Sequence, residues 1–336
     1  MQNLYRNGLT SRLQPRLPFL RFRVFSHKDA TIVKKNTALP STMMNAISTL
    51  VGTELEGEHK YRGTVAAANG SLYGMPYTAL RVVKFDLVDK SITHIGPAFD
   101  GVMGMGWTRG AITDSGFIYC PPDDEGRGVI KIDTNTDTVT ELNRNLLPER
   151  GWGMWESCAA ALNGCIYCMP LHARHIMKID PNNDDAMTSV GDDLGDNNWK
   201  YKTTVVGIDG CVYGLPYGSN RIIKYDPIND TTSFFGDIAD KAFYCTGGAL
   251  GRDGCVYAII RDGRVLKIDS TNNMHCFVGN SIESDHNQYS RGWGDAILGI
   301  DGCIYSPPMK ARHILKYDPH SDQVSLVGGR LWKHGT

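Results

Sequence analysis

An internal repeat is the feature of this sequence that most restricts its fold. An Asn-Gly, Ser-Gly or Asp-Gly pair recurs at intervals of 44 to 48 residues, and a hydrophobic residue and a Tyr follow each pair. The glycines of these pairs are Gly70, Gly116, Gly164, Gly210, Gly254 and Gly302. An Arg and then a Lys come later in every copy, the lysines being Lys84, Lys131, Lys178, Lys224, Lys267 and Lys316. Six copies with this many shared positions predict six equivalent structural units.

Each copy is predicted to form four short antiparallel strands. In the last copy these strands span residues 295–300, 303–308, 313–318 and 323–328. Asp301-Gly302 joins the first two, because an Asx-Gly pair supplies the positive φ angles that a two-residue hairpin turn needs. Asp-Pro and Asn/Asp clusters suit the other tight turn, and no segment keeps a helical hydrophobic period. Four such strands per ~40–50 residues predict an all-β fold, a β-propeller.

The number of blades depends on how the ring closes. Six copies of the first three strands are present, but the fourth-strand pattern occurs a seventh time, at residues 46–52. We therefore expect six blades within residues 46–330, with the ring closed by an N-terminal strand that joins the last blade. A seventh, degenerate blade formed from residues 20–52 is the alternative. Residues 29–45 are then a linker, and residues 331–336 are a C-terminal tail.

The first 28 residues differ in composition from the rest of the chain. They carry six Lys and Arg side chains and no acidic one, which is typical of a mitochondrial transit peptide. The stretch Arg-Val-Phe-Ser at residues 23–26 resembles the processing site of such a peptide. We expect a mitochondrial protein, with a retained basic arm as the alternative. The remaining chain has 29 cationic against 36 acidic residues, and this acidic excess argues against a nucleic-acid partner.

The repeats resemble those of Kelch, NHL and virginiamycin-B-lyase-like propellers. The resemblance rests on Asp-Gly-Cys-Ile-Tyr at residues 301–305 and on Arg-His-Ile-Leu-Lys-Tyr-Asp-Pro at residues 312–319, and it covers residues 46–328. The chain departs from Kelch because it lacks a Gly-Gly pair after the second strand, where it has pairs such as Met75-Pro76 and Pro307-Pro308. The resemblance implies the propeller architecture and leaves the activity open.

One face of the predicted ring is the expected binding surface, because the long connections, such as residues 97–107 and 280–293, all lie on it. An aromatic residue precedes most turn glycines by nine positions, and Trp107, Trp155 and Trp293 are candidates for this face. The repeated arginines are Arg81, Arg127, Arg174, Arg221, Arg264 and Arg312. They are interpreted as an anion-binding ring or, preferably, as struts between blades, because a residue present in every blade serves packing that every blade shares.

Residues that differ between copies are better functional candidates. They lie in the loops between the second and third strands and are Asp123, Asp124, Glu125, His172, His175, Lys310 and His313. If they point inward, an acidic and a basic sector face each other across one opening. Two His with carboxylates could bind a metal or serve a lyase. No catalytic residue, metal ligand or cofactor is assigned, because motif matches without geometry are weak evidence and solvated loop tips are the plainer interpretation.

Nine cysteines, an odd number, and the absence of a secretory segment indicate reduced thiols. Four of them share one repeat position that other copies fill with Ser or Phe, which predicts a packing role: Cys165, Cys211, Cys255 and Cys303.

We therefore expect a non-enzymatic scaffold or protein-interaction subunit, an accessory component of a larger mitochondrial assembly. Protein partners are expected, without nucleic acid and without a membrane span, since no run of about 18 apolar residues is present. Peripheral association with a membrane complex is left open. Two alternatives remain: a lyase or hydrolase that works at the channel mouth, and a lectin-like module for carbohydrates or small anions.

Overall fold

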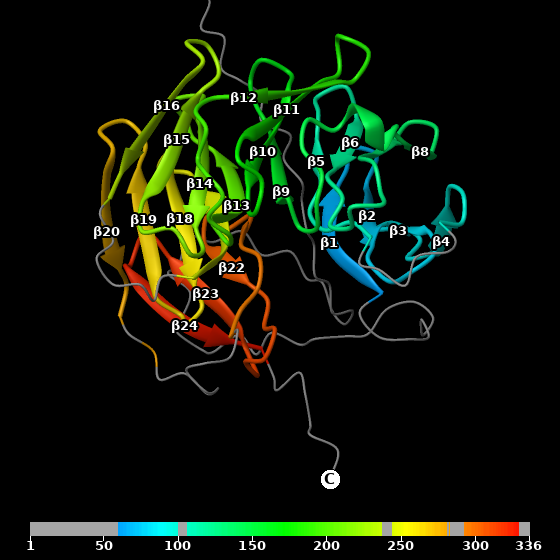
Figure 1. The fold of residues 1–336 in the computed structure, drawn as a ribbon. Coiled ribbons are helices and arrows are strands. Elements are labelled where there is room, and N and C mark those ends of the chain that lie inside the picture. Colours follow the sequence, from blue (N-terminus) through cyan, green and yellow to red (C-terminus); the bar gives the residue numbers. More distant parts are fainter. Residues whose placement is uncertain (1–59, 100–105, 237–243, 281, 283–291, 329–336) are drawn as a thin grey trace, which may run out of the picture.

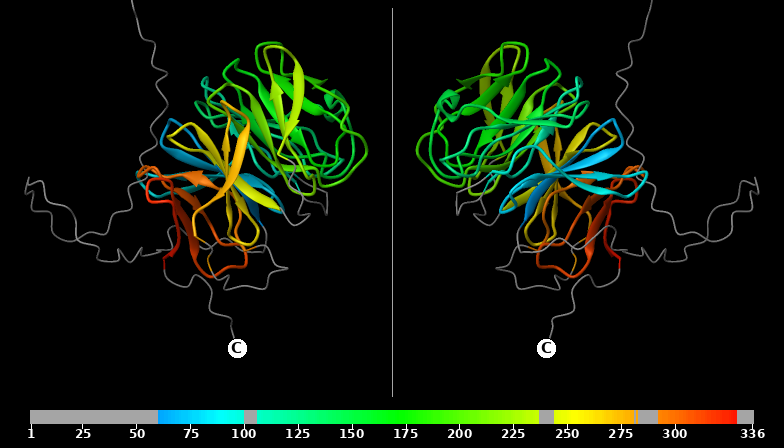
Figure 2. Two further views of the ribbon diagram at one scale, coloured as in Figure 1. Left: turned by 90° about the vertical axis from the view of Figure 1, so that its left-hand side faces the viewer. Right: turned by 90° about the vertical axis from the view of Figure 1, so that its right-hand side faces the viewer.

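Six four-stranded antiparallel sheets form the fold, one for each repeat. The computed structural model describes residues 60–99, 106–236, 244–280, 282 and 292–328. Within each sheet the strands are neighbours in chain order, and the sheets follow one another around a ring (Figure 1). Figure 2 shows the same ring from two sides. The predicted six-bladed, all-β propeller is confirmed.

The first three blades are β1 (Tyr61–Ala66), β2 (Ser71–Pro76), β3 (Val82–Asp86) and β4 (Ile92–Ile95); β5 (Ala111–Ile112), β6 (Phe117–Cys120), β7 (Ile130–Asp133) and β8 (Thr138–Glu141); and β9 (Trp155–Ala160), β10 (Ile166–Pro170), β11 (Ile176–Asp180) and β12 (Ala186–Val190). The last three are β13 (Tyr201–Val206), β14 (Val212–Pro216), β15 (Ile222–Asp226) and β16 (Thr231–Phe235); β17 (Cys245–Leu250), β18 (Cys255–Ile260), β19 (Val265–Asp269) and β20 (Met274–Val278); and β21 (Ile297–Leu298), β22 (Ile304–Ser306), β23 (Ile314–Asp318) and β24 (Gln323–Val327). Among the described residues the one helical element is the short 3-10 helix η1 (Arg144–Leu146).

The repeated glycine pairs form the first hairpin turn of each blade. Gly70 and Gly302 have φ angles of 83° and 84°, a backbone region that glycine adopts without steric cost. The residue before each glycine stabilises the turn, because the Asn69 side chain accepts a 3.0 Å hydrogen bond from the Ser71 amide, and Asp301 accepts one of 3.2 Å from Cys303. The turn chemistry of the repeat therefore fixes the register of the strands that follow.

The core lies between neighbouring sheets. One cluster of fully buried side chains joins Tyr213 and Leu215 of β14 to Val256 of β18 and Ile268 of β19, so the fourth and fifth blades share it. The four cysteines at the shared repeat position are all buried and free, in agreement with their predicted packing role. A blade buries its apolar face only against the next blade, and this is why the repeats stabilise one another.

The first strand of each blade lies innermost, and these strands pack against one another around the centre of the ring. Glycines allow this close approach at two places. A Cβ atom on Gly63 would lie 2.3 Å from the carbonyl oxygen of Thr108, and one on Gly247 would lie 2.4 Å from the amide nitrogen of Ala296. Residues near the start of each first strand therefore surround the mouth of the central channel.

The predicted ring-closing strand at residues 46–52 lies outside the described residues, as do the basic segment, the linker and the tail. All four strands of the last blade come from residues 297–327. Each described blade is thus one continuous stretch of chain.

Candidate functional site

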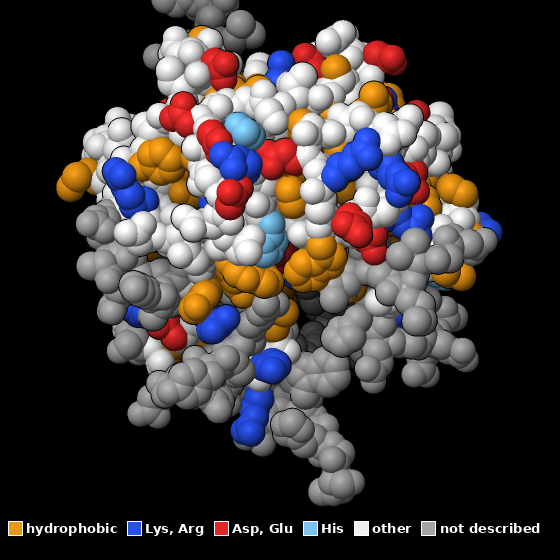
Figure 3. Space-filling view, in the orientation of Figure 1, with side chains coloured by type: hydrophobic (Ala, Val, Ile, Leu, Met, Phe, Trp, Pro, Cys, Tyr) orange, Lys and Arg blue, Asp and Glu red, His pale blue; other side chains and the backbone are white. Residues whose placement is uncertain are grey.

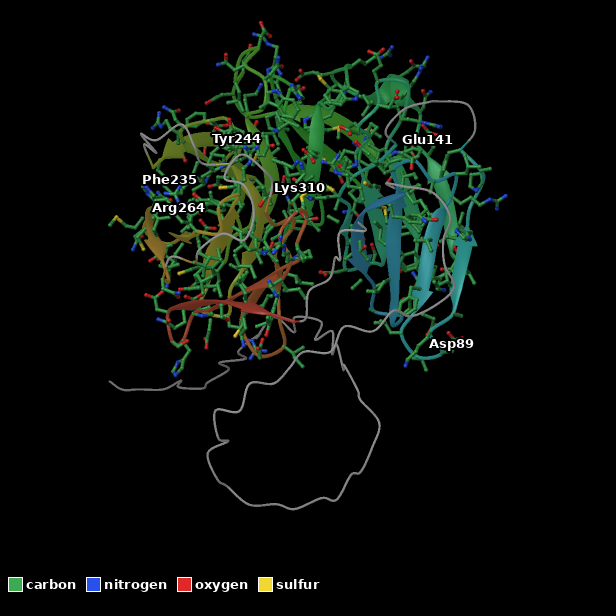
Figure 4. All side chains as sticks on the ribbon, turned by 90° about the horizontal axis from the view of Figure 1, so that it is seen from below. Asp89, Glu141, Phe235, Tyr244, Arg264 and Lys310 are labelled. Carbon is green, nitrogen blue, oxygen red and sulfur yellow. The ribbon has the colours of Figure 1, made fainter. Side chains whose placement is uncertain are left out.

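The channel mouth on the face with the long connections is the candidate site. The ends of the second and fourth strands lead to this face, and the tight turns lie on the other one. In Figure 4, Glu141 at the end of β8 and Asp89 in the β3–β4 turn mark these two faces on one side of the ring. The loops that follow β2, β6, β10, β14, β18 and β22 therefore meet the connections between blades around one opening.

The three candidate tryptophans are buried in the blades and do not lie on the binding surface. Their indole N–H groups donate to backbone carbonyl oxygens of the β6–β7, β10–β11 and β22–β23 loops, at 2.8 to 3.1 Å. Trp107, Trp155 and Trp293 therefore hold these loops in place. Their shared position in the repeat suggested binding residues around the channel mouth, but their role in the structure is to pack and to hold these loops.

The repeated arginines fasten the outer strands, mostly within their own blade. Arg81 donates to the carbonyl of Gly96 after β4, and Arg221 donates to that of Phe234 in β16, each at 3.0 Å. Arg264 lies over the aromatic ring of Phe277 in β20, and Figure 4 shows it at the outer edge of the propeller. Arg127 stacks on Trp107, and Arg174 forms ion pairs with the connection after β12. Arg312 also has an interaction partner. The contacts favour the structural interpretation, although the predicted struts between blades are largely contacts within a blade.

The loop candidates occupy different environments. Asp124 accepts a hydrogen bond from the Gly126 amide, and Glu125 is exposed. The His175 ring lies 2.9 Å from Glu149, whose carboxylate also accepts the backbone amides of residues 174 and 175. Lys310 is exposed, and His313 uses its carbonyl to accept the Trp293 indole. Asp124 and His175 therefore take part in the hydrogen bonding of their own loops and connections, whereas Glu125 and Lys310 are open to solvent.

Asp123 and His172 are brought together, around Gly153. A Cβ atom on Gly153 would lie 3.5 Å from Asp123 Oδ1 and 3.5 Å from His172 Nε2, so these two atoms are separated by at most twice that distance. Asp123 is only 4% exposed. His172 Nδ1 lies 2.9 Å from the Asn198 side-chain oxygen, whereas its Nε2 is buried without a hydrogen-bond partner.

A charged network at the start of the inner strands forms the centre of the site. Arg62 of β1 pairs with Glu156 of β9, and Lys202 of β13 lies 2.8 Å from the same Glu156 oxygen. The side chains of Glu156 and Lys202 are each 3% exposed. Arg62 also lies 3.7 Å from the Asp123 carboxylate and donates a 3.2 Å hydrogen bond to Tyr77. We call Arg62, Asp123, Glu156 and Lys202 the mouth network.

Arg109 extends this charged region across the channel. Its guanidinium donates to the carbonyl oxygens of Lys202 and Thr246, at 3.2 and 3.0 Å, and pairs with Asp295 before β21. One side chain therefore links residues of the second, fourth, fifth and sixth blades. Such a link rigidifies the mouth, because a guanidinium offers several donors in a fixed geometry.

The two carboxylates of the mouth network have opposite pKa shifts. Burial opposes ionisation of Glu156, but the attraction of Lys202, Arg62 and Arg109 outweighs it and lowers the pKa of that carboxyl. Burial raises the pKa of Asp123, and Arg62 only partly offsets this. The site therefore holds one carboxylate that is firmly ionised and a second that is easier to protonate, a combination that suits ligand binding or proton transfer.

The sequence analysis identified Asp123 and the neighbouring His172 as candidates, but it missed the other three members of the mouth network, Arg62, Glu156 and Lys202. The position directly after the repeated aromatic holds Arg62, Thr108, Glu156, Lys202, Thr246 and Gly294. This variation was visible in the sequence and was a signal, because residues that differ between copies escape the constraint of shared packing. Among the described residues no group of three or more His, Cys, Asp or Glu side chains is placed to hold a metal ion.

Comparison with known proteins identifies the fold of this protein but does not identify a chemical activity. No protein-family model and no curated protein matches the sequence. The structure is similar to virginiamycin B lyase from Staphylococcus aureus, with a TM-score of 0.66 and 13% identity over 81% of this chain and 85% of that one. A streptogramin B lyase gives a TM-score of 0.67 and 14% identity over 81% and 84% of the two chains. Kuenenia stuttgartiensis hydrazine synthase gives 0.59 and 12% over 81% and 80%. Within the described part of the chain, no helix is long and apolar enough to span a membrane. The protein thus has the fold of the virginiamycin-B-lyase-like propellers.

Proposed function

We propose that the protein is a non-enzymatic recognition subunit that binds a partner at the channel mouth. The mouth network carries this proposal. Four ionisable side chains from the first four blades meet in a largely buried position, although buried charges cost stability unless they are paired. Six equivalent blades can pack into a ring without this network, which occurs only once in the molecule. Its presence is explained by a task at the mouth.

The partner is expected to be a protein, and the setting is expected to be mitochondrial. The basic, acid-free composition of residues 1–28 supports a transit peptide and membership of a larger mitochondrial assembly. Native mass spectrometry of the protein from its cells gives the mature N-terminus and the bound partners together. A mature mass that includes residues 1–28 would contradict the transit-peptide assignment.

The binding role is tested by capture with matched variants. The full chain carrying a C-terminal tag is incubated with extract of its source cells, and the retained species are identified by native mass spectrometry. Arg62→Ala should lose the species that wild type retains, because it leaves Tyr77 and Asp123 without their cation. Arg81→Ala removes a repeated arginine away from the mouth and should retain them. Equal retention by both variants would overturn the proposal.

An enzyme acting at the same mouth is the second candidate. Asp123, whose pKa is raised by burial, and His172 Nε2 both lie close to Gly153 and are the candidates for the acid and the base that elimination or hydrolysis requires. The similar Staphylococcus aureus protein is a lyase whose structure was solved with quinupristin. Incubation of this protein with quinupristin, followed by mass spectrometry, tests that chemistry. Cleavage by wild type that Asp123→Asn abolishes would favour the enzyme.

A further inference from the structure

Two tryptophans outside the repeat pattern are exposed at the channel mouth. Trp152 and Trp199 are 47% and 40% exposed, whereas the repeated Trp107, Trp155 and Trp293 are buried with satisfied indole N–H groups. No hydrogen bond joins the indole of Trp152 or Trp199 to another described residue. Large aromatic side chains with an apolar face and a free donor are the residues that dominate recognition surfaces.

These tryptophans belong to a continuous row of rings. The centroids of Trp152 and His172 lie 5.9 Å apart, and those of His172 and Trp199 lie 4.6 Å apart. The row continues to Tyr217 at 6.0 Å and from there to Tyr244 at 5.0 Å. We call these five residues the aromatic ladder. Its members come alternately from connections between blades and from loops within blades, so the ladder runs along the rim of the mouth from the third blade to the fifth.

The backbone at Trp199 is held in an unfavourable conformation. Its φ is 62°, a region that bulky residues rarely adopt. Gly218 permits this arrangement, because a Cβ atom there would lie 2.7 Å from the Trp199 carbonyl oxygen. Residues held in sparsely populated backbone regions cost of order 1–3 kcal/mol and cluster at binding and active sites. This backbone conformation places the Trp199 ring next to the rings of His172 and Tyr217.

The polar groups along the ladder favour a ligand that accepts hydrogen bonds. The two free indole N–H groups are donors, and Arg261 stacks 4.0 Å from the Tyr244 ring centroid with its Nε buried and unpaired. Beside Trp199, the connection after β12 carries three exposed acidic residues, Asp192, Asp193 and Asp196. Two cations lie near them, Arg174, which pairs with Asp193 and Asp196, and Lys200, so the acidic residues are in excess. On the face in Figure 3, hydrophobic side chains flank a histidine below a group of acidic and basic side chains.

A proline-rich segment meets these requirements. A polyproline II helix exposes backbone carbonyls that lack internal partners, and proline has no N–H group to satisfy. Such segments dock on aromatic-lined surfaces because their shape is already formed. The exposed carboxylates beside Trp199 would also accept hydrogen bonds from the hydroxyl groups of a sugar, so the glycan screen described below separates the two ligands.

We propose that the aromatic ladder binds a proline-rich segment of a partner protein, with a basic residue of that segment next to Asp192 and Asp193. This inference rests on the proposed recognition function and names its ligand. Lys202 links the two sites, because its ammonium lies 5.0 Å from the Tyr217 ring centroid and 2.8 Å from Glu156. The exposed rings of Trp152 and Trp199 then supply most of the contact area, since Tyr217 is only 4% exposed, while the mouth network orients the segment.

The test uses a fluorescently labelled ten-residue peptide with the pattern Arg-x-x-Pro-x-x-Pro, titrated with the full-length protein. Saturable binding is expected, and Trp152→Ala and Trp199→Ala should each weaken it by about 10- to 100-fold. Trp199→Phe keeps a ring without the donor and should have an intermediate effect. Phe277→Ala removes an aromatic side chain of similar exposure on β20 and should have no effect. Thermal melting of each variant shows that it is folded.

The outcomes separate this inference from the proposed function. Absence of saturable peptide binding, or equal affinity of the Trp and Phe277 variants, would overturn the ladder as a proline-rich site. Saturable binding in a glycan screen that both Trp variants abolish would also overturn it, in favour of a sugar ligand. If Arg62→Ala still loses the captured species in either case, the recognition function stands without the ladder.

Discussion

Two sets of charged clusters lie on opposite faces of the ring and differ in how often they occur. On the tight-turn face, a Tyr, a Lys and an Asp meet in five of the blades: Tyr73, Lys84 and Asp137; Tyr119, Lys131 and Asp185; Tyr213, Lys224 and Asp209; Tyr257, Lys267 and Asp253; and Tyr305, Lys316 and Asp301. The mouth network is built once. The repeated clusters therefore stabilise the fold in most blades, whereas the mouth network, which occurs once, is the better candidate for a role in binding.

The clusters of Tyr, Lys and Asp on the tight-turn face come in two forms. In the last three blades, the Asp of the Asp-Gly turn accepts from the Tyr and Lys of its own blade. In the first two blades the turn has Asn69 or Ser115 instead, and the acid comes from the next blade, as Asp137 or Asp185. A turn Asp is thus found in every cluster that closes within a blade. The third blade has Asn163 at the turn and forms neither kind of cluster, because Tyr167 accepts from Asn163 while Lys178 pairs with Asp180.

The largest effect is expected in the mouth network. Glu156→Gln leaves Arg62 and Lys202 without their shared anion in a position from which water is largely excluded. Removing one partner of a buried ion pair costs about 3–5 kcal/mol, and urea unfolding monitored by circular dichroism measures it. Glu156→Leu combined with Lys202→Met should recover much of the loss. A Glu156→Gln variant as stable as wild type would show that these charges are well hydrated.

A smaller loss of stability is expected where a cluster on the tight-turn face joins two blades. Asp185 is 14% exposed and accepts from Tyr119 at 2.5 Å and from Lys131 at 2.6 Å. Asp185→Asn should lower the free energy of unfolding by about 1–3 kcal/mol, as expected for hydrogen bonds to a charged group. Asp253→Asn is the matched control, because that side chain is 38% exposed and pairs within its own blade. Its effect should stay below about 1 kcal/mol, and equal losses would contradict the distinction between the two forms.

The ring of blades could be predicted from the sequence because each repeat contains the residues that specify its own strands and turns. The glycine turns, the alternating strands and the buried cysteines are local features that recur, and recurrence made each one readable. The mouth network depends on which residues of three inner strands and one loop converge, and this follows from the closed ring and not from any one repeat. The tryptophans show the same limit: Trp107, Trp155 and Trp293 were visible through repetition, while Trp152 and Trp199 are exposed because they lie outside it.

The smallest effect is a change in the pH dependence of stability, and it comes from the opposite pKa shifts in the mouth network. The lowered pKa of Glu156 contributes stability that is present above its unfolded pKa of about 4.3 and is lost as pH falls. The raised pKa of Asp123 contributes stability that is present below its unfolded pKa of about 3.9 and is lost as pH rises through its folded value.

Asp123→Asn removes the second contribution only. The stability of this variant relative to wild type should therefore increase as pH rises from about 4 towards neutrality, because wild type alone must ionise a buried carboxyl over that range. Urea unfolding at a series of pH values measures the difference. Asp124→Asn, one residue away and outside the mouth network, should run parallel to wild type. If Asp123→Asn also runs parallel, Asp123 is already solvated and ionised in the folded protein, and the mouth network is reduced to the single anion of Glu156 between its cations.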